Sequence, residues 1–255
     1  MAEKTLPEGP GRPLLAETVS ALNAKLTHHG ARDVLRAAFD TVPDLALVSS
    51  FGAESVVLLH LAATTRRDVP VYMIDTEMLF PETLIYQQDV AERLRLSNMH
   101  IIRAKDIKDR DPNGALHLSD PDACCALRKT VPLNAALKNH GGWITGRKRY
   151  QSGTRASLEF FEVDGARIKV NPLARWRPED VAEYMIENRL PRHPLVSQGY
   201  PSIGCAPCTS KVAEGEDSRA GRWKGQNKDE CGIHFVDGKA VRPGASHKDT
   251  EGTAA

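Results

Sequence analysis

Short apolar segments alternate with longer amphipathic segments through the first half of the chain. Segments rich in aliphatic and β-branched residues have the length of buried strands, and we expect these strands at 45–50, 69–75 and 99–104. The segments between them, 54–65 and 81–95, have helical length. Strands that alternate with helices in this way are typical of a parallel sheet with right-handed crossovers.

The flanking segments extend the same pattern. Apolar residues at helical spacing predict a helix from Leu14 to Phe39, and 142–146 is a further candidate strand. Residues 160–173 read as a hairpin that turns at Asp164 and Gly165, and 177–190 as a helix. The sequence therefore predicts an α/β fold, with a parallel twisted sheet and flanking helices.

Composition divides the chain into three regions. Residues 1–12 are rich in Pro and Gly and predict a disordered leader. Residues 13–215 carry the strand and helix pattern, and we expect them to form one α/β domain. Residues 216–255 are polar and Gly-rich, and we expect them to form a mobile C-terminal segment.

The global charge is nearly balanced, with 34 basic and 33 acidic residues among 255. Nothing in this balance favours a nucleic-acid or membrane partner, so we expect neither. The N-terminus has no apolar stretch of signal-peptide length, and no run approaches the roughly 18 apolar residues of a membrane span. These features predict a cytoplasmic protein, in which five cysteines would bind metal or do chemistry rather than form structural disulfides.

A local asymmetry lies beneath the balanced total. Residues 124–155 contain seven Lys or Arg residues and no Asp or Glu. Such a run suggests a site for an anion or compensation of a negative cofactor, although a solvated basic face would give the same pattern. Its densest part, "TGRKRYQSGTR", includes Gly146, Arg147 and Arg149 and follows a candidate strand.

The segment "SSFGAES", residues 49–55, lies between a predicted strand and a predicted helix. Ser50 and Gly52 would let backbone amides point at an anion, and the helix N-terminus adds partial positive charge. The segment lacks the Walker and Rossmann patterns, and a simple Ser/Gly turn that caps a helix is the alternative. Asp75, at the end of the second strand, would face the same crevice.

Four cysteines form two close pairs, Cys124 with Cys125 and Cys205 with Cys208. Adjacent Cα atoms are about 3.8 Å apart, too close for an unstrained disulfide. Two such pairs match a tetrathiolate metal site, and adjacency suits a multi-iron centre better than zinc. A thioredoxin-like dithiol at the second pair is a competitor that leaves the first pair unexplained.

Cys231 is left over, in a polar segment with His234 three residues later. Arg219 and Arg222 precede it, and nearby cations stabilise a thiolate. With an anion site and a four-cysteine centre in the same chain, Cys231 is the best nucleophile candidate.

Together these motifs resemble the assimilatory adenylyl-sulfate and phosphoadenylyl-sulfate reductases. The likeness runs from about Ser49 to His234, and the combination of "CCALRK", "CAPC" and "ECGIH" is its most specific part. The resemblance implies an adenine nucleotide alpha-hydrolase-like (PP-loop) fold. Members with both cysteine pairs resemble the enzymes that act on adenosine 5′-phosphosulfate (APS) and hold a [4Fe-4S] cluster.

The resemblance also implies roles for single residues. Cys231 would attack the sulfur of APS and expel AMP, and thioredoxin or a similar dithiol would then release sulfite from the S-sulfocysteine. Both cysteine pairs would bind the cluster, and His234 would orient or polarise the reacting groups. Lys129, Arg219 and Arg222 would stabilise charge. Nucleotide and phosphosulfate contacts would come from Ser50, Gly52, Asp75, Gly146, Arg147 and Arg149.

Two positions depart from the family pattern: Tyr150 stands where an acidic residue is frequent, and Glu54 where Asp is frequent. Other functions stay open. Cluster-bearing relatives that accept the 3′-phosphorylated substrate, PAPS, exist, so a PAPS reductase is the first alternative. An ATP-using sulfurtransferase and a zinc-stabilised nucleotide-binding module are two more. The sequence leaves the oligomeric state undetermined, with a homo-oligomer as one option.

Lys129 stands four residues after Cys125. On a helix this spacing places the two side chains on one face. We therefore expect Lys129 to lie between the cysteine centre and the substrate.

Overall fold

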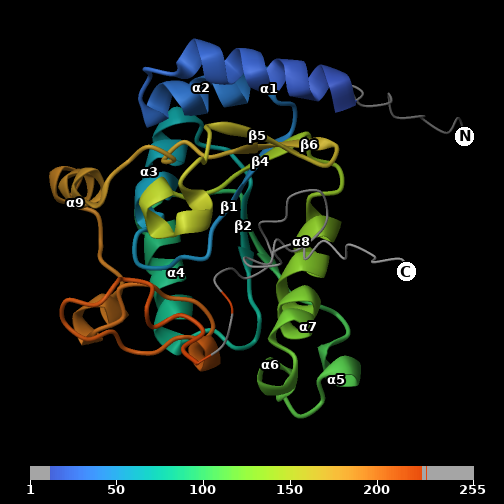
Figure 1. The fold of residues 1–255 in the computed structure, drawn as a ribbon, viewed down its shortest axis with the longest axis vertical. Coiled ribbons are helices and arrows are strands. Elements are labelled where there is room, and N and C mark those ends of the chain that lie inside the picture. Colours follow the sequence, from blue (N-terminus) through green and yellow to red (C-terminus); the bar gives the residue numbers. More distant parts are fainter. Residues whose placement is uncertain (1–11, 226–227, 229–255) are drawn as a thin grey trace, which may run out of the picture.

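The computed structural model describes residues 12–225 and residue 228 (Figure 1). The strands are β1 (Leu45–Val48), β2 (Val71–Ile74), β3 (Met99–Ile102), β4 (Gly142–Ile144), β5 (Phe161–Asp164) and β6 (Arg167–Val170). The longer helices are α1 (Arg12–Leu26), α2 (Ala31–Thr41), α3 (Ser55–Thr65), α4 (Pro81–Leu94) and α9 (Pro178–Glu187). The shorter ones are α5 (Ile107–Arg110), α6 (Leu116–Ser119), α7 (Pro121–Cys125) and α8 (Val131–Ala136).

Turns of other helix types complete the described part. A π-helix, η1 (Ala126–Thr130), joins α7 to α8. The 3₁₀ turns are η2 (Arg149–Gln151), η3 (Gly153–Arg155), η4 (Pro194–Gln198) and η5 (Ala206–Cys208). No helix among residues 12–225 is long and apolar enough to cross a membrane.

The strands form one sheet in the order β3-β2-β1-β4-β6-β5. All neighbouring pairs are parallel except β5 with β6, which form an antiparallel hairpin at one edge. Parallel strands need crossover connections, and helical segments supply them from β1 to β4: α3, then α4, then α5 to α8. The predicted sheet with flanking helices is confirmed.

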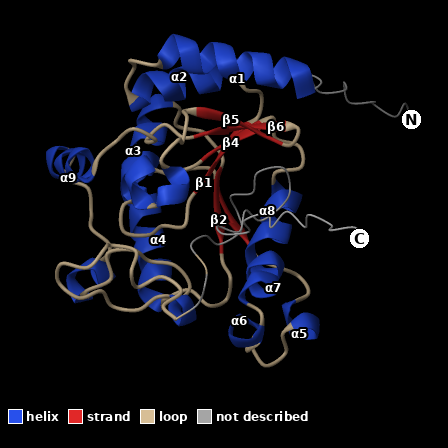
Figure 2. Ribbon diagram, in the orientation of Figure 1, coloured by secondary structure: helices blue, strands red, loops and turns tan. Residues whose placement is uncertain are grey.

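Helices cover both faces of the sheet (Figure 2). Alternate residues of one strand point to opposite faces, so Leu45 and Leu47 of β1 face the larger core, shared with α1 to α4 and α9. Ala46 faces the smaller core, where Leu133 and Leu137 of the α8 segment pack. Burial on both faces explains why the central strands β1, β2 and β4 read as continuous apolar runs.

Most predicted elements are present, with ends that differ by a few residues. The predicted hairpin forms, and Gly165 takes the left-handed φ of 63° that the turn requires. The single helix predicted from Leu14 to Phe39 is wrong, because the chain leaves the helix after Leu26 and starts again at Ala31. Gly30, with an extended backbone, is the N-cap of the second helix.

The predicted regions map onto the structure only in part. Of the predicted leader, only Arg12 is described, as the first residue of α1. Residues 216–225 lie against the loop that carries Cys208: the amide of Trp223 donates to the Cys208 carbonyl at 3.1 Å. The rest of the predicted C-terminal segment, apart from residue 228, lies outside the described residues.

Candidate active site

A cavity of about 250 Å³ opens at the carboxyl ends of β1 and β4. Its wall comes from the loops after these two strands, from 201–205 and from 218–223. The chain leaves β1 toward β2 on one side, and β4 lies on the other, so this is the topological switch point of the sheet. Crevices at such points are the usual ligand sites of open α/β sheets.

The Ser/Gly loop is held in shape by its own hydroxyl groups. Ser49 Oγ accepts from the Phe51 amide at 3.1 Å, and Ser55 Oγ accepts from the Gly52 amide at 3.0 Å. The left-handed φ falls on Phe51, at 49°, and not on Gly52. A Cβ on Gly52 would lie 3.3 Å from the Ile203 carbonyl, so this glycine permits close approach of the 201–205 loop.

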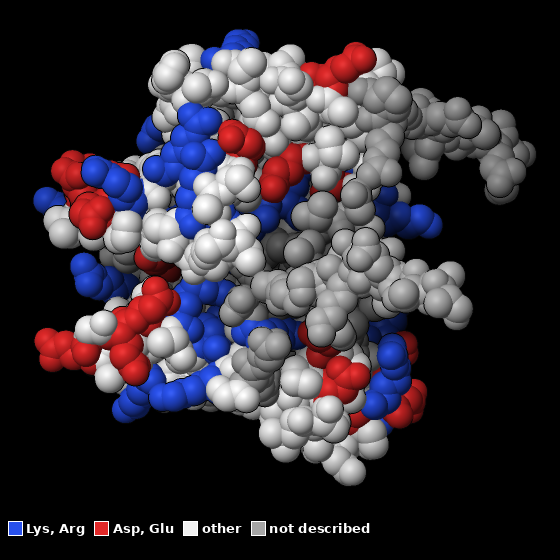
Figure 3. All heavy atoms as spheres, in the orientation of Figure 1, with Lys and Arg blue, Asp and Glu red and all other residues white. Residues whose placement is uncertain are grey.

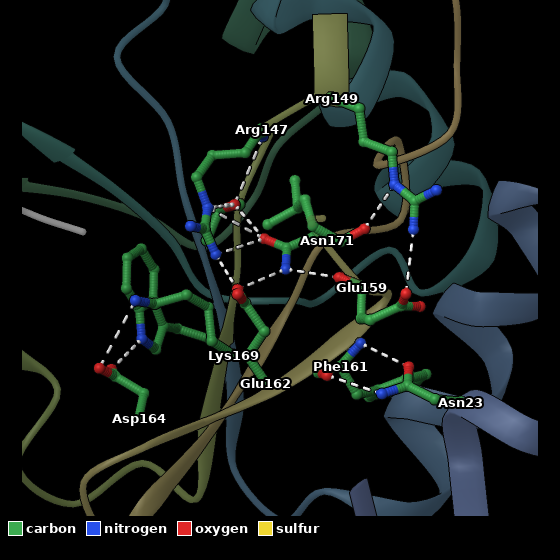
Figure 4. A network of polar contacts seen from close by, with 12 residues as sticks. Asn23, Arg147, Arg149, Glu159, Phe161, Glu162, Asp164, Lys169 and Asn171 are labelled. Atoms are coloured by element: carbon green, nitrogen blue, oxygen red, sulfur yellow. Dashed lines mark hydrogen bonds and ion pairs between the residues drawn. The ribbon is translucent and has the colours of Figure 1, made fainter. Parts of the chain in front are cut away.

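The basic loop after β4 is fixed by a buried amide. Asn171 Oδ1 accepts from Thr145 Oγ1 at 2.8 Å and from Arg147 Nη2 at 3.0 Å (Figure 4). Its Nδ2 donates to the Glu159 carbonyl and to Glu162, which also pairs with Arg147. Because Thr145 and Arg147 both line the cavity, Asn171 sets the shape of its wall from behind.

The two predicted cysteine pairs come together in space. Cys124, Cys125 and Cys205 are buried, and Cys208 is half-buried. Burial, followed by the charges of Cys125, Cys205 and Cys208, raises the pKa of the Cys124 thiol to about 11, against the opposing effect of Arg128. Thiols that couple in this way lie near one another although 80 residues separate the pairs.

The four thiols form an all-cysteine set with cations beside it. Among the described residues, no group of three or more His, Cys, Asp or Glu is spaced to hold a single metal ion. An all-thiol set that is buried and beside cations fits an iron–sulfur cluster, whose irons are held by thiolates and whose negative charge those cations would balance.

Cations stand beside the cysteines at the wall of the cavity. Burial and Cys205 raise the pKa of the Cys208 thiol, whereas Lys129 and Arg222 act in the opposite direction. Lys129, Arg219 and Arg222 all line the cavity, and so does Cys205. Lys and Arg atoms gather in the hollowed centre of this face (Figure 3). The three predicted cationic residues are thus brought to one place.

The segment that carries Arg222 is tightly packed. The Arg222 guanidinium lies 4.4 Å from the centre of the Trp223 ring. A Cβ on Gly204 would be 2.3 Å from Arg222 Nη2, so the guanidinium lies directly on this glycine. Only a residue without a side chain admits Arg222 in this position.

Arg128, the neighbour of Lys129, has a structural part. Its Nη1 donates to the Thr76 carbonyl at 2.7 Å, and its Nη2 pairs with Asp111 at 2.7 Å, with both side chains 4% exposed. The Thr76 hydroxyl also contacts Cys205 Sγ at 3.2 Å. Arg128 therefore fixes the π-helix to the end of β2, beside the cysteines.

Of the other predicted substrate contacts, Ser50, Gly52 and Gly146 line the cavity. Asp75 and Arg149 do not. The Asp75 carboxylate forms an ion pair with Arg103 at 2.8 Å, and Arg149 forms one with Glu159 at 3.0 Å.

The nucleophile candidate Cys231 and its neighbour His234 lie outside the described residues, so their roles stay predictions. Lys148 stands between two of the predicted contacts but was not itself singled out; it is a buried cavity residue that pairs with Glu54 at 2.8 Å. The sequence signal that could have indicated Lys148 was its position in residues 124–155, the stretch without Asp or Glu.

A switch-point crevice with a Ser/Gly loop and converging cations defines an α/β protein that binds a nucleotide or a similar anion. The chain belongs, more particularly, to the family described as the phosphoadenosine phosphosulfate reductase domain, whose model matches residues 44–211.

Two curated relatives are named adenosine 5′-phosphosulfate reductase. The one from Chelativorans sp. is 45% identical over 88% of this chain and 94% of its own length. The one from Mesorhizobium japonicum is 48% identical over 75% of this chain and 76% of its own length.

A solved structure with the same fold is the phosphoadenylyl-sulfate (PAPS) reductase from Candida auris, in a phosphate complex. It is 30% identical, with a TM-score of 0.67, over 77% of this chain and 97% of that one. The similarity confirms the predicted PP-loop fold.

Proposed function

We propose that the protein reduces APS to sulfite and AMP in sulfate assimilation. The observation that carries this proposal is the cavity at the switch point, where Lys129, Arg219 and Arg222 meet the Ser/Gly loop beside the cysteine pairs. The family and the relatives named adenosine 5′-phosphosulfate reductase support the same substrate.

The reaction proceeds in two displacements. The Cys231 thiolate attacks the sulfur of APS, an S–S bond forms, and the S–O bond to phosphate breaks so that AMP leaves with the electron pair. A thiolate of thioredoxin or a similar dithiol then attacks Cys231 Sγ and releases sulfite. This attack leaves a mixed disulfide between Cys231 and the dithiol. The second thiolate of the dithiol then attacks the dithiol's own sulfur in that bond, which closes the dithiol's disulfide and releases the Cys231 thiolate, so the dithiol supplies two electrons. His234 would orient the reacting groups.

The cationic residues act on the charge of the first displacement. A sulfuryl group between an attacking thiolate and a leaving phosphate concentrates negative charge, which Lys129, Arg219 and Arg222 stabilise in place. Because these cations stand in the wall before the ligand arrives, little reorganisation is needed at the moment of reaction.

Cys124, Cys125, Cys205 and Cys208 would hold a [4Fe-4S] cluster. The cluster supplies structural and electrostatic support when bound, and no step here passes electrons through it. The protein's own residues prepare this place: the Arg128 anchor holds the first pair near β2, and residues 221–223 brace the second pair. Reduced thiols require a reducing compartment, so we place the protein in the cytoplasm.

The alternative is a PAPS reductase, which the Candida auris structure favours. The test compares sulfite release from APS and from PAPS, with thioredoxin, on protein purified without oxygen. We expect sulfite mainly from APS, about four irons and four sulfides per chain, and no sulfite from Cys231→Ser. Turnover by Cys231→Ser would refute the mechanism, and zinc without sulfide would refute the cofactor. Preference for PAPS would establish the alternative.

A further inference from the structure

The carboxylate of Glu54 is held by donors from a single short segment. The Tyr150 hydroxyl donates to both of its oxygens, at 2.9 Å each. Lys148 Nζ donates to Oε2 at 2.8 Å, and Gln151 Nε2 reaches the same oxygen at 3.4 Å. Glu54 belongs to the Ser/Gly loop and the donors to the basic loop, so this cluster joins the two loops that form the cavity wall.

Lys148 is the buried member of the cluster. Its side chain is 3% exposed and lines the cavity, and its second acceptor is the Gly146 carbonyl at 3.2 Å. Burial lowers the pKa of Lys148, Glu54 opposes that effect, and Arg155 adds to it. The ammonium therefore depends on Glu54 to keep its charge in this buried position.

Tyr150 suits the position beside Glu54 because it donates without adding charge. Burial, followed by the charges of Glu54 and of Glu179 in α9, raises the pKa of the Tyr150 hydroxyl, which keeps its proton at any ordinary pH. An acidic side chain here would instead place two carboxylates together, and like charges at this distance repel. Tyr150 and Glu54 therefore pair without a second negative charge.

We propose that Tyr150 is a positioning residue, which fixes Glu54 and, through Glu54, holds the ammonium of Lys148 at the wall of the substrate cavity. The proposal deepens the proposed function, on which it rests. Glu54, Lys148 and Tyr150 all line the cavity, so a fixed Glu54 carboxylate keeps the Lys148 ammonium where an anionic phosphosulfate would bind. Without the Tyr150 hydroxyl, the Glu54 carboxylate can turn toward the substrate and oppose its charge.

The effect falls on binding rather than on chemistry, because Lys129, Arg219 and Arg222 stay in place. We expect Tyr150→Phe to raise the KM for APS about tenfold, as loss of hydrogen bonds to a charged group does, and to change kcat less than twofold. Tyr184→Phe is the matched control. It removes a hydroxyl that contacts His60 Nδ1 at 2.8 Å, away from the cavity lining, and should leave both constants unchanged.

Two further arms separate positioning from a merely structural role. In Glu54→Gln the burial of Lys148 is unopposed, so its pKa falls further and the KM for APS should rise with pH more steeply than in wild type between pH 6.5 and 9. Tyr150→Asp should weaken APS binding more than Tyr150→Phe. Adding Glu54→Gln to Tyr150→Asp should recover part of that loss, because one of the two carboxylates is removed.

The affinity for AMP, measured by calorimetry, provides a readout independent of turnover, and thermal unfolding shows that each variant is folded. An active wild type with unchanged KM and AMP affinity in Tyr150→Phe and Glu54→Gln would overturn the positioning role alone. A wild type that yields no sulfite would overturn the proposed function. In that case the AMP affinity of Tyr150→Phe and Glu54→Gln still tests the positioning role of Tyr150. Affinities equal to that of the wild type would overturn this role as well.

Discussion

The backbone amide of Trp223 donates to the carbonyl of Cys208 at 3.1 Å, so a cysteine of the second pair and the arginine segment share a hydrogen bond. The contact is not isolated. The Ser210 amide donates to the Gly221 carbonyl at 2.8 Å, and Thr209 and Arg222 form an antiparallel bridge. The cysteine loop and the segment that presents cations to the cavity are therefore one two-stranded unit.

Gly221 tests this unit, because a Cβ at this position would lie 2.1 Å from the Ser210 carbonyl oxygen. We expect Gly221→Ala to force the two segments apart, raise the KM for APS at least about tenfold and lower the iron content. Steady-state kinetics and iron analysis measure both effects. Gly153→Ala is the control, since its Cβ meets nothing within 4 Å. The same KM and iron content in Gly221→Ala and Gly153→Ala would contradict the link between the cysteine loop and the arginine segment.

Lys129 tests the link between the cysteines and the cavity. Lys129 lines the cavity, and its charge acts to lower the pKa of the Cys208 thiol. Lys129→Ala removes this charge. We expect kcat to fall about 100-fold, the size of one lost charge-stabilising donor, with iron per chain unchanged. Exposed Lys138, replaced by Ala, is the control. Loss of iron in parallel with activity would mean that Lys129 holds the centre together instead.

His193 predicts sensitivity of the fold to acid. Its ring is 1% exposed, Nε2 contacts Thr83 Oγ1 at 3.0 Å, and Nδ1 accepts from the Leu195 amide. Burial lowers the pKa of His193 from 6.5 to about 4, although Glu82 opposes the shift. The neutral ring therefore stabilises the fold fully above pH 6.5, and this contribution is lost as pH falls toward 4.

Between pH 7.5 and 5.5 the loss should be about 1 kcal/mol in the free energy of unfolding. Urea unfolding of wild type at both pH values measures it. His193→Gln should lack this part of the pH dependence, while His28→Gln, at an exposed position, should retain it. Identical pH dependence in wild type and His193→Gln would show that the ring titrates normally.

The central strands β1, β2 and β4 were predictable because they are largely buried on both faces and bounded by turn residues. The break between α1 and α2 was not, because apolar residues continue at helical spacing on both sides of Gly30. Side-chain direction was the harder question. Three consecutive cations follow β4, and only the path of the backbone decides that Lys148 enters the cavity while Arg149 turns to Glu159.

Asp75 shows what pattern reasoning omits. Its position at a strand end was correct, but Arg103 follows the neighbouring parallel strand at the same edge of the sheet and takes the carboxylate. Strand order, which a single sequence does not reveal, determines that pairing. The proximity of the two cysteine pairs, in contrast, was predictable from the chemistry of thiols alone, because a shared metal site explained all four cysteines and a dithiol at the second pair did not.

The π-helix at Ala126–Thr130 has a consequence for the length of this segment. The cysteine pair precedes it, and Leu133 and Leu137, which pack on the sheet, follow it. Each residue of an α-helix turns the chain by about 100°, so one residue more or fewer would rotate the cysteines away from their place while the leucines kept theirs. The wide turn of the π-helix thus sets the rotation of the cysteines relative to the leucines along one helical segment. An insertion or deletion between Cys125 and Leu133 should therefore be tolerated as poorly as a substitution of these residues.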